Sequence, residues 1–341
     1  MRGREGEQLA GSRPIGGWIE AILFVLAIGL IGVVYAVANR FGTHVVALML
    51  HSMTLAGIAL LVVFGVGSAG GAIARAPISW LVGSANILVE VFYFLSIVWV
   101  SPAEASLLVR QALPLSLAAG VLVFRRRIGW RAWLGAVVVA AAVTWLVTAL
   151  PAERRWIALA LTAICAVSFV GRGFASEFHP WNRAARTVRE KMQITGMVTL
   201  VTALGGWALV GALMAAVHAG VLPATTLLPV PADFVHAPTL VVAALVGGGL
   251  FVAMNYLAFS AVVKIGTEGL VAASTFMPPA TLLLQTLAVG LGLIPAVALD
   301  WSLLPAMGVA VAGVMLVIWE QRRNALTATS AAAPPRVPDQ P

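Results

Sequence analysis

The sequence SPAEASLLVRQALPLSLAAGVLVF (residues 101–124) reads as one apolar helix, yet it carries a permanent positive charge, Arg110, well inside it. A helix that begins at Pro102 places Arg110 about 12 Å along its axis, near the middle of a hydrocarbon core roughly 30 Å thick. An arginine at that depth costs about 2.5–3.5 kcal/mol on insertion scales, and it usually faces a bundle interior or a water-filled cavity. The stretch therefore indicates a membrane-spanning helix with a polar centre.

The composition of the whole chain also indicates a membrane protein. Of the 341 residues, 61% are hydrophobic and 10% are charged, whereas a soluble domain carries about 25% charged residues. The net charge of +8 is not a nucleic-acid signal, because the basic residues lie in short loops between apolar runs. The single cysteine and the unpaired spacing of the five histidines predict no disulfide, no metal site and no cofactor.

Ten apolar runs are long enough to cross a bilayer, which takes about 20 residues. We predict an all-α integral membrane protein with ten transmembrane helices at residues 17–38, 44–66, 77–99, 102–124, 130–150, 156–177, 192–217, 238–262, 268–292 and 301–319. With both termini on one side, most of the 21 lysines and arginines fall on that side, and the outer loops hold only Arg40, Arg154 and Arg155. This bias predicts cytoplasmic termini, and we expect a bacterial inner membrane location.

The two halves of the chain look like copies of each other. A shift of 164 residues aligns FYFLSIVWVSPAEASLLVRQALP (92–114) with YLAFSAVVKIGTEGLVAASTFMP (256–278) without a gap. Five spans per copy is an odd number, so the copies insert with opposite orientation, as in secondary transporters with a substrate site near the midplane. We expect a cytoplasmic tail (1–16), two inverted five-helix repeats (17–150 and 151–320) and a disordered tail (321–341).

Segments of both halves resemble the drug/metabolite transporter superfamily, in its ten-span EamA-type branch. They are SPAEASLLVRQALPLSLAAGVLVF, RRRIGWRAW and LGAVVVAAAVTWLV in the first half, and TEGLVAASTFMPPATLLLQTLAVGLGL and MGVAVAGVMLV in the second. The resemblance implies a ten-helix transporter that moves small metabolites, amino acids or drugs without ATP.

Two charged residues are predicted near the middle of the membrane, and each has more than one interpretation. Arg110 either binds a substrate carboxylate or phosphate through two parallel hydrogen bonds, or forms a structural ion pair with a buried acid. Its candidate partner is Glu90, which shares a helix face with Gly83, Asn86 and Tyr93. For Glu90, a role in proton or cation coupling, a static pair with Arg110 and a water-facing position all remain open.

Two further acids are predicted at helix starts. Ser101, Pro102 and Glu104 have the spacing of a capping box, which satisfies the first backbone N–H groups of a helix. Glu268 follows Thr267 at the corresponding place in the second half, where a negative charge suits the helix dipole. Helix-start stabilisation is the favoured role of both acids, and a gate at each membrane face is the alternative.

The second half offers more polar or aromatic candidates for the substrate site, with helix packing as the alternative for each. They are Asn255, Tyr256, Phe259, Ser274 and Gln285. Pro114, Pro278 and Pro279 are predicted to interrupt spans four and nine at corresponding positions, which favours a midplane cavity between spans three, four, eight and nine. Arg172, near the inner end of span six, is expected to be an interface anchor.

These features predict a secondary transporter that moves a small acidic metabolite by alternating access, with protons as a candidate coupling ion and a homodimer as a candidate assembly. An alternative keeps the fold but carries a lipid-linked phosphate between leaflets, with Arg110 and Arg172 following the head group. A membrane-embedded enzyme is not expected, because no nucleophile–base or metal set has suitable spacing.

Overall fold

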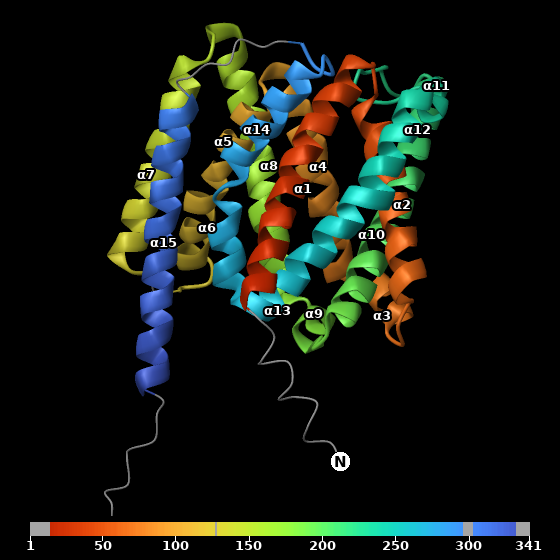
Figure 1. Ribbon diagram of the computed structural model, residues 1–341. Coiled ribbons are helices and arrows are strands. Elements are labelled where there is room, and N and C mark those ends of the chain that lie inside the picture. The colour runs from red at the N-terminus through yellow and green to blue at the C-terminus, as the bar shows by residue number, and fades with distance from the viewer. Residues whose placement is uncertain (1–13, 127, 296–302, 332–341) are drawn as a thin grey trace, which may run out of the picture.

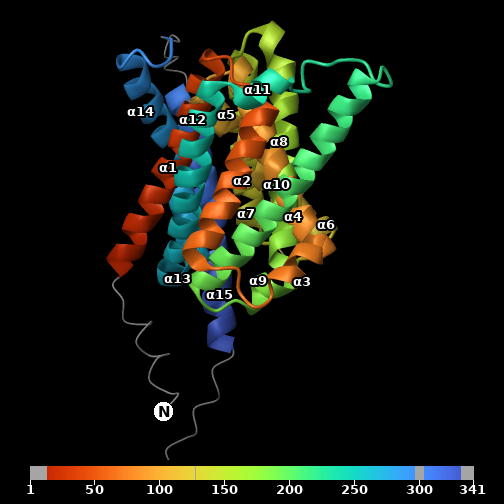
Figure 2. The ribbon, with the colours of Figure 1, turned by 90° about the vertical axis from the view of Figure 1, so that its right-hand side faces the viewer.

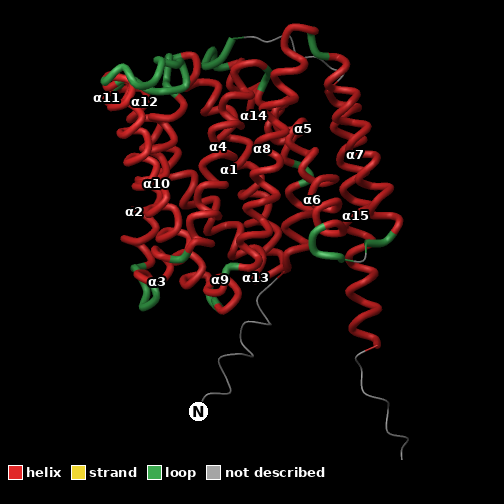
Figure 3. The backbone as a smooth tube through the Cα atoms, turned by 180° about the vertical axis from the view of Figure 1, so that it is seen from behind, coloured by secondary structure: helices red, strands yellow, loops and turns green. Residues whose placement is uncertain are grey.

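The computed structural model describes residues 14–126, 128–295 and 303–331, which form a bundle of long helices (Figure 1). Nine helices among these residues are long and apolar enough to cross a membrane, and the described part of the chain contains no strand. Loops gather at the two ends of the bundle (Figure 3). The chain is thus an all-α protein with the build of a multi-pass membrane protein, in which each helix satisfies its own backbone.

The uninterrupted long helices follow the predicted spans closely at most of their ends. They are α1 (Pro14–Arg40), α2 (Val45–Phe64), α4 (Pro77–Trp99), α7 (Trp130–Ala149), α8 (Ala152–Phe178), α10 (Val188–His218) and α15 (Leu303–Ala331). Short helices α3 (Gly70–Arg75) and α9 (Pro180–Ala184) lie at the end of the bundle where α1 begins, and α11 (Pro231–Val235) lies at the opposite end (Figures 1 and 2).

The last helix differs from its prediction. We expected disorder from residue 321, but α15 continues to Ala331. The segment QRRNALTATSA is rich in helix formers and holds no glycine or proline, so nothing local ends the helix there. Residues 332–341 of the predicted tail lie outside the described part of the chain, as do residues 1–13 of the N-terminal tail.

Two spans are interrupted at corresponding positions, as predicted from their prolines. In the first half α5 (Pro102–Leu108) passes through the 3₁₀ turn η1 (Val109–Gln111) into α6 (Ala112–Leu122). In the second half α13 (Val252–Ser274) ends two residues before α14 (Met277–Gly290). A proline lacks an N–H and its ring clashes with the carbonyl four residues earlier, which is Arg110 for Pro114 and Ser274 for Pro278.

The predicted boundary between spans eight and nine is wrong. A loop was expected between residues 262 and 268, but α13 remains helical to Ser274. The spanning segment Ala237–Ile265 ends near this point, and α13 and α14 are labelled at opposite ends of the bundle (Figures 1 and 2). Only two residues separate the end of α13 from the start of α14, so the break itself is short. The break leaves α14 only 14 residues, too short to span a bilayer alone.

A wide helical turn was not anticipated from the sequence. Between α12 (Ala237–Ala243) and α13, residues Ala244–Phe251 form the π-helix η2, which contains three consecutive glycines. A Cβ on Gly247 would lie 2.1 Å from the carbonyl oxygen of Ser52 in α2. The glycine therefore allows the backbones of η2 and α2 to approach each other closely.

The long helices pack in reciprocal pairs. Helix α1 packs against α13 and α14, and α8 packs against α4 and α6. Helix α2 packs against α10, and α7 packs against α15. In the last pair a Cβ on Gly135 would lie 2.4 Å from the carbonyl oxygen of Gly313, so the two backbones meet at small residues.

Basic side chains gather at the end of the bundle where α1 begins and α15 ends, which we call the basic end. The described loops and helix ends there hold Arg75, Arg125, Arg126, Arg131, Arg183, Arg186, Arg189, Lys191, Lys264 and Arg323. The opposite end holds Arg40, Arg154 and Arg155. The predicted asymmetry of charge is therefore present between the two ends of the fold.

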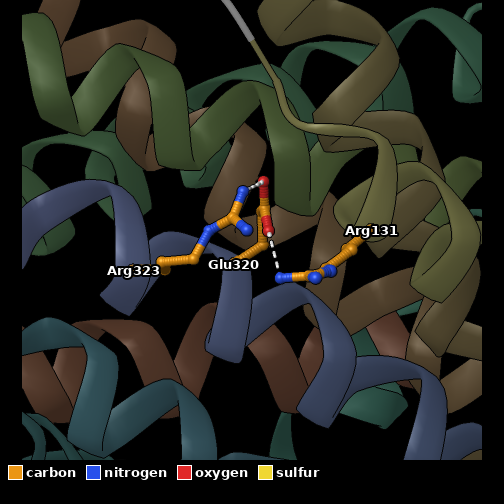
Figure 4. Close-up of polar contacts among 3 residues, drawn as sticks. All are labelled: Arg131, Glu320 and Arg323. Carbon is orange, nitrogen blue, oxygen red and sulfur yellow. Dashed lines mark hydrogen bonds and ion pairs between the residues drawn. The ribbon is translucent and has the colours of Figure 1, made fainter. Parts of the chain in front are cut away.

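Ion pairs between distant segments also lie at the basic end. Glu320 in α15 is 3% exposed and lies between Arg131 and Arg323, at 3.9 Å and 3.1 Å (Figure 4). The Arg131 guanidinium stands over the Trp319 ring at 4.7 Å. A Cβ on Gly129 would lie 1.8 Å from a Glu320 carboxylate oxygen, so this glycine makes room for the buried acid.

Candidate functional site

A buried carboxylate–phenol pair joins α1 to α4 in the interior of the bundle. The Tyr35 hydroxyl donates a hydrogen bond of 2.8 Å to the Glu90 carboxylate. Tyr35 is fully buried and Glu90 is 8% exposed. A buried carboxylate needs such donors to offset the loss of water. Glu90 is therefore not in the water-facing position that was one of its three predicted roles.

Arg172 of α8 points into the bundle beside this pair. Its guanidinium donates to the Asn86 side-chain oxygen and lies 4.8 Å from the centre of the Phe169 ring. Its charge also acts on Glu90. The expected interface anchor is therefore wrong. Asn86 and Glu90 are far from Arg172 in sequence, and the packing of α8 on α4 brings them near it.

Arg110 lies in the interrupted region η1, and Glu90 does not neutralise it. Among the described residues no carboxylate oxygen lies within 4 Å of the Arg110 guanidinium. Its Nη2 contacts the Met277 sulfur of α14 at 2.7 Å, and its Nε is buried without a hydrogen-bond partner. A thioether is only a weak acceptor. The predicted static pair between Glu90 and Arg110 is absent from the structure.

Tyr93 lies near both charged groups, Glu90 and Arg110. The side chain is 6% exposed and its hydroxyl is buried without a partner. It lies close enough to Glu90 and to Arg110 to interact electrostatically with both. A Cβ on Gly32 of α1 would lie 2.8 Å from the Tyr93 hydroxyl oxygen, so Gly32 makes space for the phenol.

Other side chains hold the interrupted helices in place. Gln111 of η1 donates to the Thr162 hydroxyl of α8 at 3.1 Å. The Gln285 side chain of α14 accepts the Ala103 backbone N–H at the start of α5, at 3.0 Å. Gln285 was predicted as a substrate contact, but the structure gives its oxygen a backbone partner at a helix start.

The acid at the start of α5 adopts the predicted capping box. The Ser101 N–H donates to the Glu104 carboxylate at 2.6 Å, and the Glu104 N–H donates to the Ser101 hydroxyl at 3.2 Å. This confirms the helix-start geometry of Glu104. The side chain of its counterpart Glu268 lies outside the described part of the structure, although its backbone belongs to α13.

Most second-half candidates lie apart from the Arg110–Glu90 cluster, which consists of Tyr35, Asn86, Glu90, Tyr93, Arg110 and Arg172. Asn255 donates to the Phe251 carbonyl of its own helix at 2.7 Å. Tyr256 is 43% exposed and stacks on Phe64 at 6.3 Å. Among the described residues, no hydrogen bond or ring contact links these two side chains or Phe259 to the cluster. Ser274, in contrast, ends α13 at the break beside Met277, which touches Arg110.

The cluster draws on different helices from those predicted. Spans three, four and nine contribute as expected, but spans one and six supply Tyr35 and Arg172 in place of span eight. Sequence reasoning missed Tyr35 altogether. A single phenol within the apolar first span was the available signal, since the chain holds only three tyrosines.

The charges of the cluster do not balance. The cluster holds two guanidiniums, Arg110 and Arg172, but one carboxylate, Glu90, which accepts a hydrogen bond from Tyr35 and interacts electrostatically with Arg172. Buried charges are normally paired or hydrogen-bonded. Arg110 therefore has a free Nε–H donor and an uncompensated charge, which suit an anionic ligand with planar oxygens.

Comparison with known proteins supports the overall fold. No family model matches the chain, and no curated protein matches it. The chain is similar to a solved structure described only as "Crystal structure of protein", with 19% sequence identity and a TM-score of 0.52. The similarity covers 90% of this chain and 99% of that one. The shared feature is therefore the overall helical fold.

Proposed function

We propose that this chain is a secondary transporter that moves a small organic metabolite bearing a carboxylate or another acidic group. The uncompensated Arg110 guanidinium at the interrupted helix carries the proposal. A cation inside a membrane bundle is costly and usually marks a substrate or ion pathway. The Arg110 Nε–H has no hydrogen-bond partner, and the buried Tyr93 hydroxyl beside it is likewise unpartnered, so both can donate to a carboxylate or phosphate.

We propose further that the bundle has ten spans arranged as two inverted repeats of the drug/metabolite transporter type. If α1 corresponds to α8, and α4 to the α12–α13 segment, then the contact of α1 with α13 corresponds to that of α8 with α4. If α2 likewise corresponds to α10, and α7 to α15, then each of these pairs packs a helix against its own counterpart in the other half. The matching interruptions before Pro114 and Pro278 support the same correspondence.

The charge asymmetry supports an orientation. In our proposal the basic end faces the cytoplasm, which puts both termini there, and the bilayer is a bacterial inner membrane. Both interrupted helices would then meet near the midplane, where irregular backbone is tolerated if it lines a cavity.

Transport would proceed by alternating access, with the two halves rocking about the site. Arg110 would bind the acidic group, and Tyr93 would donate a hydrogen bond to it. Glu90 would accept a proton during the cycle. Protonation would weaken its electrostatic attraction to Arg172 and change its hydrogen bond with Tyr35. Glu104 and Glu268 would lie near opposite faces, where a gate role is compatible with their places at helix starts.

The alternative of a lipid-linked phosphate carrier has less support. It requires Arg110 and Arg172 to follow one head group, but Arg172 is already engaged by Asn86 and interacts with Glu90. One free guanidinium suits a single small acidic group. The bond between Arg172 and Asn86 thus favours the small-metabolite proposal.

A thermal-shift screen tests the proposal. Purified full-length protein would be heated with carboxylates, amino acids and phosphorylated metabolites at two pH values, because a ligand of the folded state raises the melting temperature by mass action. An acidic ligand should raise the melting temperature of the wild type by several degrees and leave Arg110→Ala unchanged. The exposed Arg75→Ala variant is the matched control and should respond like the wild type. An equal shift in Arg110→Ala would contradict the proposal.

A further inference from the structure

A groove opens between α7 and α8 at the end opposite the basic end. Its volume is about 270 Å³, and it is lined by Val143, Thr144, Val147, Thr148, Arg155, Trp156 and Leu159. The two helices follow each other through a short turn, but α7 packs on α15 and α8 packs on α4. They therefore diverge and leave this space between them.

The groove combines an apolar wall with one cation at its mouth. Val143 and Leu159 line the deeper part, just under two turns from the helix ends, and Val147 lies about half a turn from the end of α7. Arg155 lies in the first turn of α8 and donates to the Thr148 and Leu150 carbonyls at 2.9 Å and 3.0 Å. Its Nε is buried without a partner.

The surroundings place this mouth at the depth of lipid head groups. Trp156 is 71% exposed beside Arg155, and tryptophan is enriched where the hydrocarbon core meets the polar region. Arg154 adds a second positive charge, and only Glu153 opposes the two in this turn. A buried N–H without an acceptor is costly, so the Arg155 Nε–H would be stabilised by an acceptor that reaches it.

We propose that this groove binds one phospholipid with an anionic head group from the adjacent leaflet. Its phosphate oxygen would accept the Arg155 Nε–H, and one acyl chain would lie against Val143, Val147 and Leu159. The net positive charge of the turn would favour phosphatidylglycerol over phosphatidylcholine, whose choline adds a positive charge. This site is separate from the Arg110 cluster, and its occupation does not depend on transport.

Native mass spectrometry of the purified, delipidated full chain tests the proposal. Phosphatidylglycerol and phosphatidylcholine with the same acyl chains would be titrated, and inorganic phosphate would be added as a competitor. We expect one saturable phosphatidylglycerol site, at least about tenfold weaker binding of phosphatidylcholine, and no displacement by inorganic phosphate. Equal binding of the two lipids, or full displacement by phosphate, would overturn the proposal.

Variants locate the site. Arg155→Ala should weaken phosphatidylglycerol binding at least about tenfold, since a hydrogen bond to a charged group is lost, whereas its neighbour Arg154→Ala should retain most of it. Arg155 also binds the end of α7, so Arg155→Ala could unfold. Thr144→Trp, at an exposed position that lines the groove, leaves those bonds intact and fills the groove, and it should likewise weaken binding. Unchanged binding in Thr144→Trp places the lipid elsewhere.

Discussion

At the scale of single residues, Glu90 and Arg110 have different partners, and this difference determines which charged group is available to a ligand. Glu90 accepts a hydrogen bond from Tyr35 and interacts electrostatically with Arg172, while Arg110, among the described residues, contacts the Met277 sulfur and interacts with the Tyr93 phenol. A static pair between Glu90 and Arg110 would have left no free charge. The observed arrangement keeps one cation available and one carboxylate able to change its proton content.

Replacing Glu90 by glutamine should separate binding from coupling. Glu90→Gln keeps an acceptor for Tyr35 but cannot take up a proton, so transport measured between about pH 6 and pH 8 should lose its pH dependence. We expect substrate still to bind, because Arg110 is unchanged. A wild-type pH profile in Glu90→Gln would show that this carboxylate does not couple protons, and Glu153→Gln, exposed at the opposite end from the basic end, is the matched control.

His179, in the turn between α8 and α9, predicts a pH effect on stability. Its Nδ1 accepts the Asn182 N–H at 3.4 Å, so its Nε2 carries the proton and donates to Ser79 at 2.9 Å. Burial, and then the charge of Lys191, lower the pKa of His179 from its ordinary value of 6.5. The unfolded chain therefore binds the proton more readily than the folded chain.

The direction of the pH effect on stability follows from this difference in proton binding. The stabilisation is complete above about pH 6.5 and is lost as the pH falls through the lower pKa of the folded state. The wild-type melting temperature should drop more between pH 7.5 and pH 5 than that of His179→Gln, which cannot titrate. Parallel curves for the two proteins would rule out this contribution.

At the scale of helices, close backbone contacts fix the pairs. The α7–α15 contact depends on Gly135 and Gly313, which leave no room for a side chain between them. We expect Gly135→Ala to destabilise the protein by about 1–3 kcal/mol, because the added Cβ must push the backbones apart.

A glycine in open space provides the control for that prediction. Gly211 lies within α10, and a Cβ there would meet nothing within 4 Å. Gly211→Ala should be neutral or stabilise the fold by up to about 1 kcal/mol through helix propensity. Thermal unfolding of both variants in the same detergent compares them, and equal melting temperatures would contradict the role given to Gly135.

The sequence allowed the helices to be predicted better than their contacts. Apolar length identifies a span because lipid imposes the same requirement everywhere, and Pro114 and Pro278 locate the interruptions through local chemistry. The end of span eight was missed because GTEGL contains no proline to stop the helix. The partners of Arg172 and Glu90 were missed because Asn86 and Tyr35 reach them only through tertiary packing.

At the scale of the whole molecule, three ion pairs at the basic end each join the first half of the chain to the second. They are Glu20–Lys264, Arg126–Glu177 and Arg131–Glu320. Among the described residues no ion pair joins the halves at the opposite end. If the halves rock during transport, these bonds hold the basic end together in the conformation described.

Loss of two of these pairs should loosen that end. Spin labels on Gly71→Cys in α3 and Ala184→Cys in α9, both exposed, would report the separation of the halves in a Cys165→Ala background. In Glu20→Gln/Glu320→Gln the distance distribution measured by pulsed electron resonance should extend to longer values. Asp233→Asn, at the other end, is the control. An unchanged distribution would mean that these pairs do not control opening.

The central claim is that the Arg110 guanidinium receives the acidic group of a transported substrate. The most direct measurement is uptake, in proteoliposomes, of an acidic ligand that stabilises the wild type. We predict that Arg110→Ala folds but transports at least about 30-fold more slowly, that Arg110→Lys retains part of the activity, and that Arg75→Ala is normal. Transport by Arg110→Ala at the wild-type rate would contradict the account.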